Sequence, residues 1–268
     1  MSAGAGGTLA DLRNMQGERL DHALRGPVAA TAPSTLAIIG HGVTSHWDRP
    51  WQTELADALA RAGIPSLLVS FAGNGQSEGR FEDATPTKES ADLSAVIDAV
   101  TTWGVRRVIY IGHSMGGAVG VLRASADTRV ALLVSLAGMF HVHAFMQRHF
   151  GHLEPGRGLM LDKPGCVWNA PLEADAARIG SLVTEAAAIR VPWLLVHGDA
   201  DELVPLDDSI DARDAAGGDA TLVVLPGADH RFTGAVETMS SAVVDWLGAH
   251  GVTPTRAAFQ DAARAPAR

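Results

Sequence analysis

Two serines in the chain lie within a Gly-x-Ser-x-Gly pattern, which is typical of a nucleophilic serine on a sharp turn. Ser114 is the central residue of Gly-His-Ser-Met-Gly at 112–116, after an apolar run and before a stretch with helical periodicity. A strand–turn–helix context suits a nucleophile, because the tight turn requires small residues two positions to either side of the serine. The turn also points the helix N-terminus at the reaction centre. We therefore predict that Ser114 is the nucleophile of an acyl transfer.

The second serine of this pattern is Ser77, in Gly-Gln-Ser-Glu-Gly at 75–79. It also follows an apolar run, but residues 79–83 do not begin a helix with an inward apolar face, and glycines at 73, 75 and 79 indicate a loop. A motif match counts only in its structural context, so we expect Ser77 to be a turn residue. The structural alternative for Ser114 is the N-cap of a helix.

A serine hydroxyl is a poor nucleophile at neutral pH and needs a neighbouring base. On a sheet of this kind the acid and then the histidine follow the serine along the chain. The apolar run at 193–196 is followed by Asp199 and Asp201, and the last run, at 222–225, is followed by His230. The carboxyl ends of parallel strands lie at one edge of the sheet, where ligands bind. We predict His230 as the base. The candidates for the acid are Asp199, Asp201, Asp207 and Asp208, with Asp201 favoured and Asp199 next.

Other ionisable residues near these positions have simpler interpretations. The chain has 11 histidines, so a histidine alone indicates little. His41 is expected to tie loops together by hydrogen bonds, and His197 is expected to be structural. His250 lies late in the last predicted helix and is expected to act as a last-turn cation. Asp229 is expected to be a turn residue, although it precedes the predicted base.

Acyl transfer builds negative charge on a carbonyl oxygen, which two backbone N–H groups must stabilise. One should belong to Met115, the residue after the nucleophile. The other should come from the loop after the first central strand, which here reads His-Gly-Val-Thr at 41–44. Glycine at 42 lets the backbone turn inward, so we predict that Val43 supplies the second N–H.

These residues depend on elements that alternate between short apolar runs and amphipathic stretches, a pattern typical of βαβ units. The runs are continuously apolar, as in parallel strands covered on both faces, and they lie at residues 36–39, 67–69, 108–111, 131–136, 193–196 and 222–225. Two weaker strands are expected within 14–25. Helical periodicity predicts helices that carry Leu55, Leu93, Val119 and Val243, the second with Thr85 as its N-cap.

The stretch at 139–188 interrupts this alternation. It is about twice as long as the usual connection and is rich in aromatic residues and methionine, so we expect a small cap inserted over the strand ends. We call residues 139–188 the cap segment. The remaining residues of 1–250 form a single α/β domain with it, and 251–268 is expected to be a loose tail.

The composition excludes several kinds of partner. Lys and Arg number 21 against 30 Asp and Glu, a net charge of −9, so neither nucleic acid nor a membrane surface is an expected partner. The start of the chain lacks a signal-peptide pattern, and no apolar run reaches the length of a membrane-spanning helix. We expect a cytoplasmic protein. The one cysteine, Cys166, excludes an intramolecular disulfide.

Five motifs in this order resemble the α/β-hydrolase superfamily: Gly-His-Gly at 40–42, the glycine-rich segment at 73–79, Gly-His-Ser-Met-Gly at 112–116, His-Gly-x-x-Asp-x-x-Val-Pro at 197–205 and Gly-Ala-Asp-His at 227–230. The resemblance is greatest to small-capped serine esterases such as feruloyl and cinnamoyl esterases and related carboxylesterases. It implies an eight-stranded, mostly parallel central sheet flanked by helices. It also implies a triad of Ser114, Asp201 and His230, with Val43 and Met115 forming the oxyanion hole.

The leading hypothesis is therefore a serine hydrolase that cleaves small-molecule esters with a hydrophobic part through an acyl-enzyme, without a cofactor. Peptidase, thioesterase, carbon–carbon hydrolase and acyltransferase chemistry remain alternatives on the same triad, and a non-catalytic binding protein is a further one. Four histidines of the cap segment have spacings that occur in metal sites: His141, His143, His149 and His152. No cysteine lies among them, and we expect no metal there.

Overall fold

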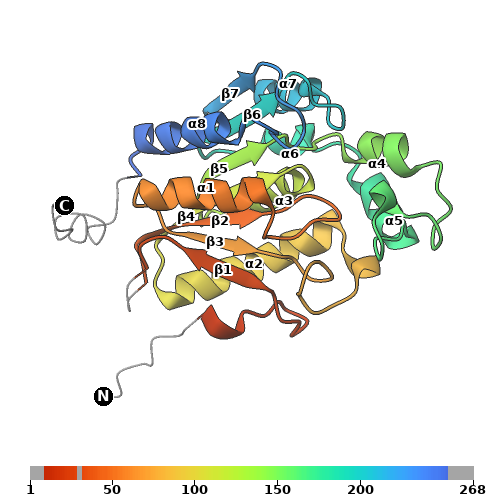
Figure 1. The fold of residues 1–268 in the computed structure, drawn as a ribbon, viewed down its shortest axis with the longest axis horizontal. Helices are drawn as coiled ribbons and strands as arrows, with labels where there is room; N and C mark the ends of the chain where they lie inside the picture. Colours follow the sequence, from red (N-terminus) through yellow and green to blue (C-terminus); the bar gives the residue numbers. More distant parts are fainter. Residues whose placement is uncertain (1–8, 29–31, 253–268) are drawn as a thin grey trace.

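The computed structural model describes residues 9–28 and 32–252, which form one seven-stranded sheet in the order β1-β3-β2-β4-β5-β6-β7 (Figure 1). Only β1 pairs antiparallel with its neighbour, and the other strands are parallel. The strands are β1 (His22–Arg25), β2 (Thr35–Gly40), β3 (Ser66–Val69), β4 (Arg107–His113), β5 (Val130–Leu136), β6 (Trp193–Gly198) and β7 (Ala220–Leu225). The α/β-hydrolase fold class expected from the sequence is therefore present, with strands at all six predicted apolar runs.

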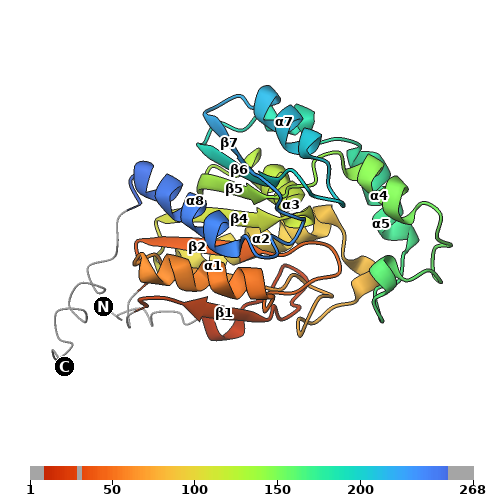
Figure 2. The same ribbon diagram turned by 45° about the horizontal axis from the view of Figure 1, so that its top comes forward.

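Helices cover both faces of the sheet, and each face has its own apolar core. On one face α1 (Pro50–Arg61) packs against α8 (Val236–Ala249), and on the other α2 (Pro86–Trp103) packs against α3 (Met115–Ala124) (Figure 2). The predicted N-cap of α2 is confirmed, since the Thr85 hydroxyl oxygen accepts a hydrogen bond from the Lys88 N–H. Smaller elements are η1 (Leu9–Asp11), η2 (Phe81–Asp83) and α7 (Leu206–Ala215).

The N-terminal part differs from the prediction of a strand pair within 14–25. In the described residues only β1 comes from this segment, so the sheet has seven strands and the expected eight is wrong. The residues before β1 form a turn instead, in which the Asn14 side-chain oxygen accepts hydrogen bonds from the N–H groups of Gln16 (3.1 Å) and Glu18 (2.9 Å). Such local side-chain bonds satisfy donors that a strand ladder would use.

The cap segment lies between β5 and β6 and contains α4 (Val142–Phe150), η3 (Met160–Asp162), α5 (Ala170–Ile179) and α6 (Val183–Ala186). Helices α4 and α5 pack together at one end of the molecule, and α5 also contacts α2 (Figures 1 and 2). The Phe and Trp residues of the cap segment are buried, which explains why this part of the sequence is rich in them. Phe150 packs against Trp168 with ring centroids 5.6 Å apart.

The predicted tail at 251–268 lies outside the described residues apart from Gly251 and Val252. Within the described ranges, every helix is too short or too polar to cross a membrane.

Candidate active site

Ser114 lies at the turn between β4 and α3, with φ 54° and ψ −118°. The crowding around this turn explains its glycines. A Cβ atom on Gly112 would lie 2.1 Å from the carbonyl oxygen of Gly116, and one on Gly116 would lie 2.6 Å from the carbonyl oxygen of His41. A positive φ is unfavourable for a residue with a side chain, so the turn stores strain that the surrounding contacts maintain.

The hydroxyl of Ser114 does not cap α3, although the residue occupies the N-cap position. The backbone holds the residue in place instead. Its N–H donates to the Leu136 carbonyl at 2.9 Å, and its carbonyl accepts from the N–H groups of Gly117 and Met139. The hydrogen bond that would make Ser114 a side-chain cap of α3 is therefore absent. The hydroxyl remains available for other contacts.

Ser77 has the opposite environment. Its hydroxyl donates to the Ser70 carbonyl at 2.7 Å and accepts from the Asp21 N–H at 2.8 Å, which joins the loop at 73–79 to the strand region beside it. No helix follows it directly, because the next element is the short η2. Ser77 is a turn residue, as the sequence predicts.

His230 and Asp201 meet beyond the ends of β7 and β6. The Nδ1 of His230 donates to Asp201 Oδ2 at 2.8 Å, and His197 Nε2 lies 3.2 Å from the same oxygen. The other oxygen, Oδ1, accepts from the N–H groups of Leu203 and Val204, each at 2.9 Å. The carboxylate thus holds the loop after β6 in place and fixes the His230 ring, whose Nε2 is left as an acceptor.

The Asp201 side chain is almost fully buried, with 1% of its surface exposed. Burial alone would raise the pKa of this carboxyl, but the hydrogen bonds from His197 and His230 outweigh that effect and hold the pKa well below its usual value. Asp201 is therefore ionised at neutral pH, as an acid that orients a histidine must be.

The competing acids form other bonds. Asp199 accepts from the Gly227 N–H at 2.6 Å, and Asp229 accepts from the N–H groups of Arg231 and Thr233. Both carboxylates therefore stabilise loop backbone. Among the carboxylates of the described residues, only Asp201 forms an ion pair with His230.

Three other histidines are structural. His41 donates from Nδ1 to the Gly42 carbonyl and accepts the Phe71 N–H at Nε2, and burial lowers its pKa to about 4. His113 donates from Nε2 to the His230 carbonyl at 2.8 Å, and burial, followed by the charge of His230, lowers its pKa to about 3. His250 bonds to the carbonyl of Trp246 within its own helix turn.

The loop after β2 reaches Ser114 as predicted. A Cβ atom on Gly42 would lie 2.9 Å from the Ser114 Cβ, so glycine permits this close approach. Val43 follows Gly42 in the same loop, and Met115 begins α3. Among the described residues, neither Val43 nor Met115 donates a backbone hydrogen bond. Both predicted N–H groups are therefore unused beside the serine.

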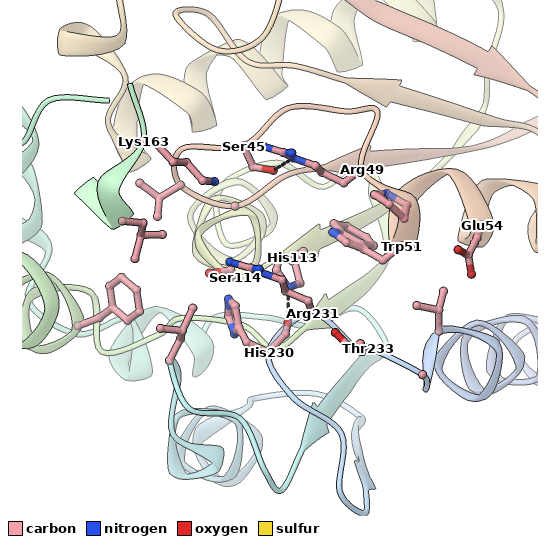
Figure 3. A pocket seen from close by; sticks show the side chains of 18 residues that line it. Ser45, Arg49, Trp51, Glu54, His113, Ser114, Lys163, His230, Arg231 and Thr233 are labelled. Carbon is pink, nitrogen blue, oxygen red and sulfur yellow. Dashed lines mark hydrogen bonds between the residues drawn. The ribbon is translucent and has the colours of Figure 1, made fainter. Parts of the chain in front are cut away.

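A cavity of about 540 Å³ opens over Ser114 and His230, and Figure 3 shows both side chains near its centre. Part of its wall is apolar, from Val43, Trp51, Phe145, Leu161 and Val236, and part is cationic. The cations are Arg49, Lys163 and Arg231. Sequence reasoning did not find them, because they come from three distant segments, and only Arg231, next to the predicted base, has a position in the chain that could have indicated it.

Two of the four histidines of the cap segment have other partners. His141 pairs with Asp211 at 2.9 Å, and His149 bonds to the Leu203 carbonyl. Over the described ranges, no group of three or more His, Cys, Asp or Glu side chains is placed to hold a metal ion.

A family model described as serine aminopeptidase, S33, matches residues 31–169, just over half of the chain. The chain belongs to this α/β-hydrolase family. This hydrolase is 27% identical to an uncharacterised protein of Mycobacterium tuberculosis over 188 residues, which are 68% of the chain but only 59% of that relative's length. It is also 27% identical to a monoacylglycerol lipase of Mycolicibacterium smegmatis, over 82% of the chain and 90% of that protein.

Among solved structures, the hydrolase is similar to Est1E from Butyrivibrio proteoclasticus with ferulic acid bound. The TM-score is 0.74 at 23% identity, and the superposition covers 86% of this chain and 95% of Est1E. At that identity the likeness concerns the fold. It agrees with the α/β-hydrolase fold that the sequence motifs imply.

Proposed function

We propose that this hydrolase cleaves carboxylic esters through an acyl-enzyme on Ser114, with His230 as general base and Asp201 as the acid that orients it. The observation that carries the proposal is the contrast in hydrogen bonding at the site. The Ser114 hydroxyl is left unused on a strained turn, in the same cavity as a histidine whose far nitrogen is bound to a buried carboxylate.

The proposed mechanism follows from the tautomer of His230. Because Nδ1 donates to Asp201, Nε2 is free to take the Ser114 proton as the hydroxyl attacks the ester carbonyl. The N–H groups of Val43 and Met115 stabilise the developing oxyanion. His230 then returns the proton to the leaving alcohol, and water repeats the sequence on the acyl-enzyme. Each of these steps uses side chains and backbone of this chain.

The apolar wall of the cavity favours an ester with a hydrophobic part, since Trp51, Phe145 and Leu161 offer surface that excludes water. The names of the similar proteins point the same way, because a monoacylglycerol lipase and a ferulic acid complex both concern hydrophobic acyl compounds. We extend only that general chemistry to this chain.

The family description also raises aminopeptidase activity. An aminopeptidase must bind the ammonium group of its substrate, and carboxylates suit that task. Glu54 is the one carboxylate among the residues that line the cavity, whereas three cations line it. A site with that balance repels an ammonium group, so we favour ester hydrolysis.

The test is hydrolysis of p-nitrophenyl esters from acetate to palmitate by the wild type, by Ser114→Ala and by Ser77→Ala. We expect turnover of short or medium esters and a loss of about 10³-fold or more in Ser114→Ala. Ser77→Ala is the matched control and should retain activity. Equal activity of Ser114→Ala and wild type would refute the nucleophile assignment, and a wild type inactive on every ester would refute ester hydrolysis.

A further inference from the structure

Three cationic side chains line the cavity above Ser114, in a chain whose net charge is −9. Arg49 precedes α1, Lys163 lies in the cap segment, and Arg231 follows the proposed base. Cations scattered over an acidic surface would be drawn toward carboxylates. The grouping of three of them around one cavity therefore needs a physical explanation.

The two lysines of the chain show what is unusual here. Lys88 lies 2.6 Å from a Glu18 carboxylate oxygen and 3.9 Å from one of Asp92, so its charge is balanced. Lys163 has no carboxylate within ion-pair distance in the part of the chain that the structure describes. Its Nζ donates to the carbonyl and hydroxyl oxygens of Thr44, at 2.9 and 3.0 Å. An ammonium group has a further donor, which remains unused.

The two arginines also have few partners, although the charge of Arg231 helps to lower the pKa of the Asp229 carboxyl. Arg49 donates from Nε to the Ser45 hydroxyl at 3.3 Å, and the Arg231 side chain has no hydrogen-bond partner within the described residues. Neither forms an ion pair there. Figure 3 shows Glu54, the one carboxylate that lines the cavity, on the side away from Lys163. Most of the donors of both guanidinium groups are thus available.

These charges also affect one another. Burial lowers the pKa of the Lys163 ammonium, and the positive charges of Arg49 and Arg231 lower it further. Like charges in a half-buried site repel each other and destabilise the empty pocket. A bound anion would remove that repulsion and recover the lost free energy.

A second cavity, of about 430 Å³, meets the first at these residues. Ser45, Arg49 and Lys163 line both cavities, and in Figure 3 Lys163 and Arg49 point toward the Ser45 loop from opposite sides. Arg49 and Lys163 therefore lie where the two spaces meet, whereas Arg231 lines the first cavity alone.

We propose that the site takes an ester that carries a second, negatively charged group, a carboxylate or a phosphate, bound by Arg49, Lys163 and Arg231 while Ser114 attacks the ester carbonyl. This inference rests on the proposed function. Guanidinium and ammonium groups together suit an oxyanion, because they offer paired donors and a point charge.

The experiment compares matched charged and uncharged esters. One pair places the charge on the acyl part, 4-nitrophenyl hydrogen adipate against 4-nitrophenyl hexanoate. The other places it on the alcohol part, 4-carboxyphenyl hexanoate against 4-carbamoylphenyl hexanoate. For the wild type we expect kcat/KM to favour the anionic member of at least one pair by about ten-fold or more, and the preference to weaken at high salt.

The variants are Arg49→Gln, Lys163→Gln and Arg231→Gln, with Arg157→Gln as the control. The Arg157→Gln change also removes one positive charge, from the cap segment. The Arg157 side chain is 79% exposed and lies outside the cavity. Each pocket variant should lower the ratio of anionic to neutral kcat/KM by about ten-fold, and the control should leave it unchanged. A purely structural role of these residues would lower both rates in parallel and preserve the ratio.

Two outcomes separate this inference from the proposed function. Ser114-dependent hydrolysis without a preference for either anionic ester overturns the anion site and leaves ester hydrolysis intact. If no ester is hydrolysed, the proposed function fails, and binding decides the anion site. Adipate or inorganic phosphate should then raise the Tm of the wild type but not of Arg49→Gln/Arg231→Gln, and which of them does so distinguishes carboxylate from phosphate. Equal shifts in both proteins, or none, overturn the inference.

Discussion

The loops at 75–79 and 112–116 share one sequence pattern and have opposite physical states. In the first, the Ser77 hydroxyl is fully bound, as donor to Ser70 and acceptor from Asp21. In the second, the Ser114 hydroxyl makes no capping bond while the backbone is held at a strained φ of 54°. The same sequence pattern therefore leaves one hydroxyl bound and the other available for the attack that we propose for Ser114.

The backbone around Ser77 also differs from the backbone around Ser114. The loop at 75–79 is anchored to the body by Asn74, whose amide donates to the Ala72 carbonyl and to the buried Glu89 carboxyl. Its glycines adopt positive φ, at 59° for Gly75 and 94° for Gly79. At 112–116, neither glycine has a positive φ, and both are required by space instead. One pattern therefore encodes a loop with left-handed glycines in one place and a tight strand–helix turn in the other.

The variant with the largest expected effect on activity changes Asp201, the acid of the triad that we propose with Ser114. Asp201→Asn keeps the shape of the side chain but disturbs the tautomer of His230, so we expect ester hydrolysis to fall by about 10³-fold or more. The measurement is kcat/KM on the best p-nitrophenyl ester. Asp199→Asn is the matched control, because that carboxylate bonds to the Gly227 N–H and not to His230. Comparable losses in both variants would contradict the assignment of the acid.

The next largest expected effect is on stability, and it comes from the close packing of the turn at 112–116. Gly112→Ala would place a methyl group against the Gly116 carbonyl, where the separation is 2.1 Å, so the strand and helix must move apart. We expect a loss of about 3 kcal/mol in the free energy of unfolding, measured by denaturant titration. Gly248→Ala is the control, because a Cβ there meets nothing within 4 Å and α8 should gain slightly. An unchanged stability of Gly112→Ala would mean that the elbow is looser than described.

The smallest expected effect is the loss of stability in Ser77→Ala. Ser77→Ala leaves the Asp21 N–H and the Ser70 carbonyl without their partner, so we expect a loss of about 1–2 kcal/mol in stability. The measurement is thermal or denaturant unfolding, with ester hydrolysis followed in parallel. Activity should be retained after correction for the folded fraction. A specific loss of turnover in a well-folded Ser77→Ala protein would break the distinction between the two loops.

Much of this site follows from local features of the sequence. The strands were predictable because β2 to β7 are continuously apolar, and His230 because it follows the last of them directly. The choice of Asp201 over Asp199 rested on resemblance, since both lie in one loop and only the fold shows which carboxylate turns toward His230.

The grouping of Arg49, Lys163 and Arg231 around the cavity could not be predicted from the sequence, and neither could the N-terminal turn. The reason is different in each case. Arg49 and Lys163 are 114 positions apart in the numbering, and no periodicity connects them. Their meeting depends on how the cap segment packs over the body. In the segment before β1 the Asn14 side chain accepts from the N–H groups of Gln16 and Glu18, and the backbone forms only an isolated bridge between Arg13 and Arg19.

One hydrogen bond has a consequence for loop engineering. His113, beside the proposed nucleophile at the end of β4, donates to the backbone carbonyl of His230 beyond β7, across the intervening β5 and β6. Burial lowers the pKa of His113 to about 3, so the ring is neutral at neutral pH and donates this bond through Nε2. The loop that carries the histidine therefore has a fixed length between β7 and that anchor. Grafts from related hydrolases should tolerate insertions in the cap segment far better than a one-residue change at 226–229.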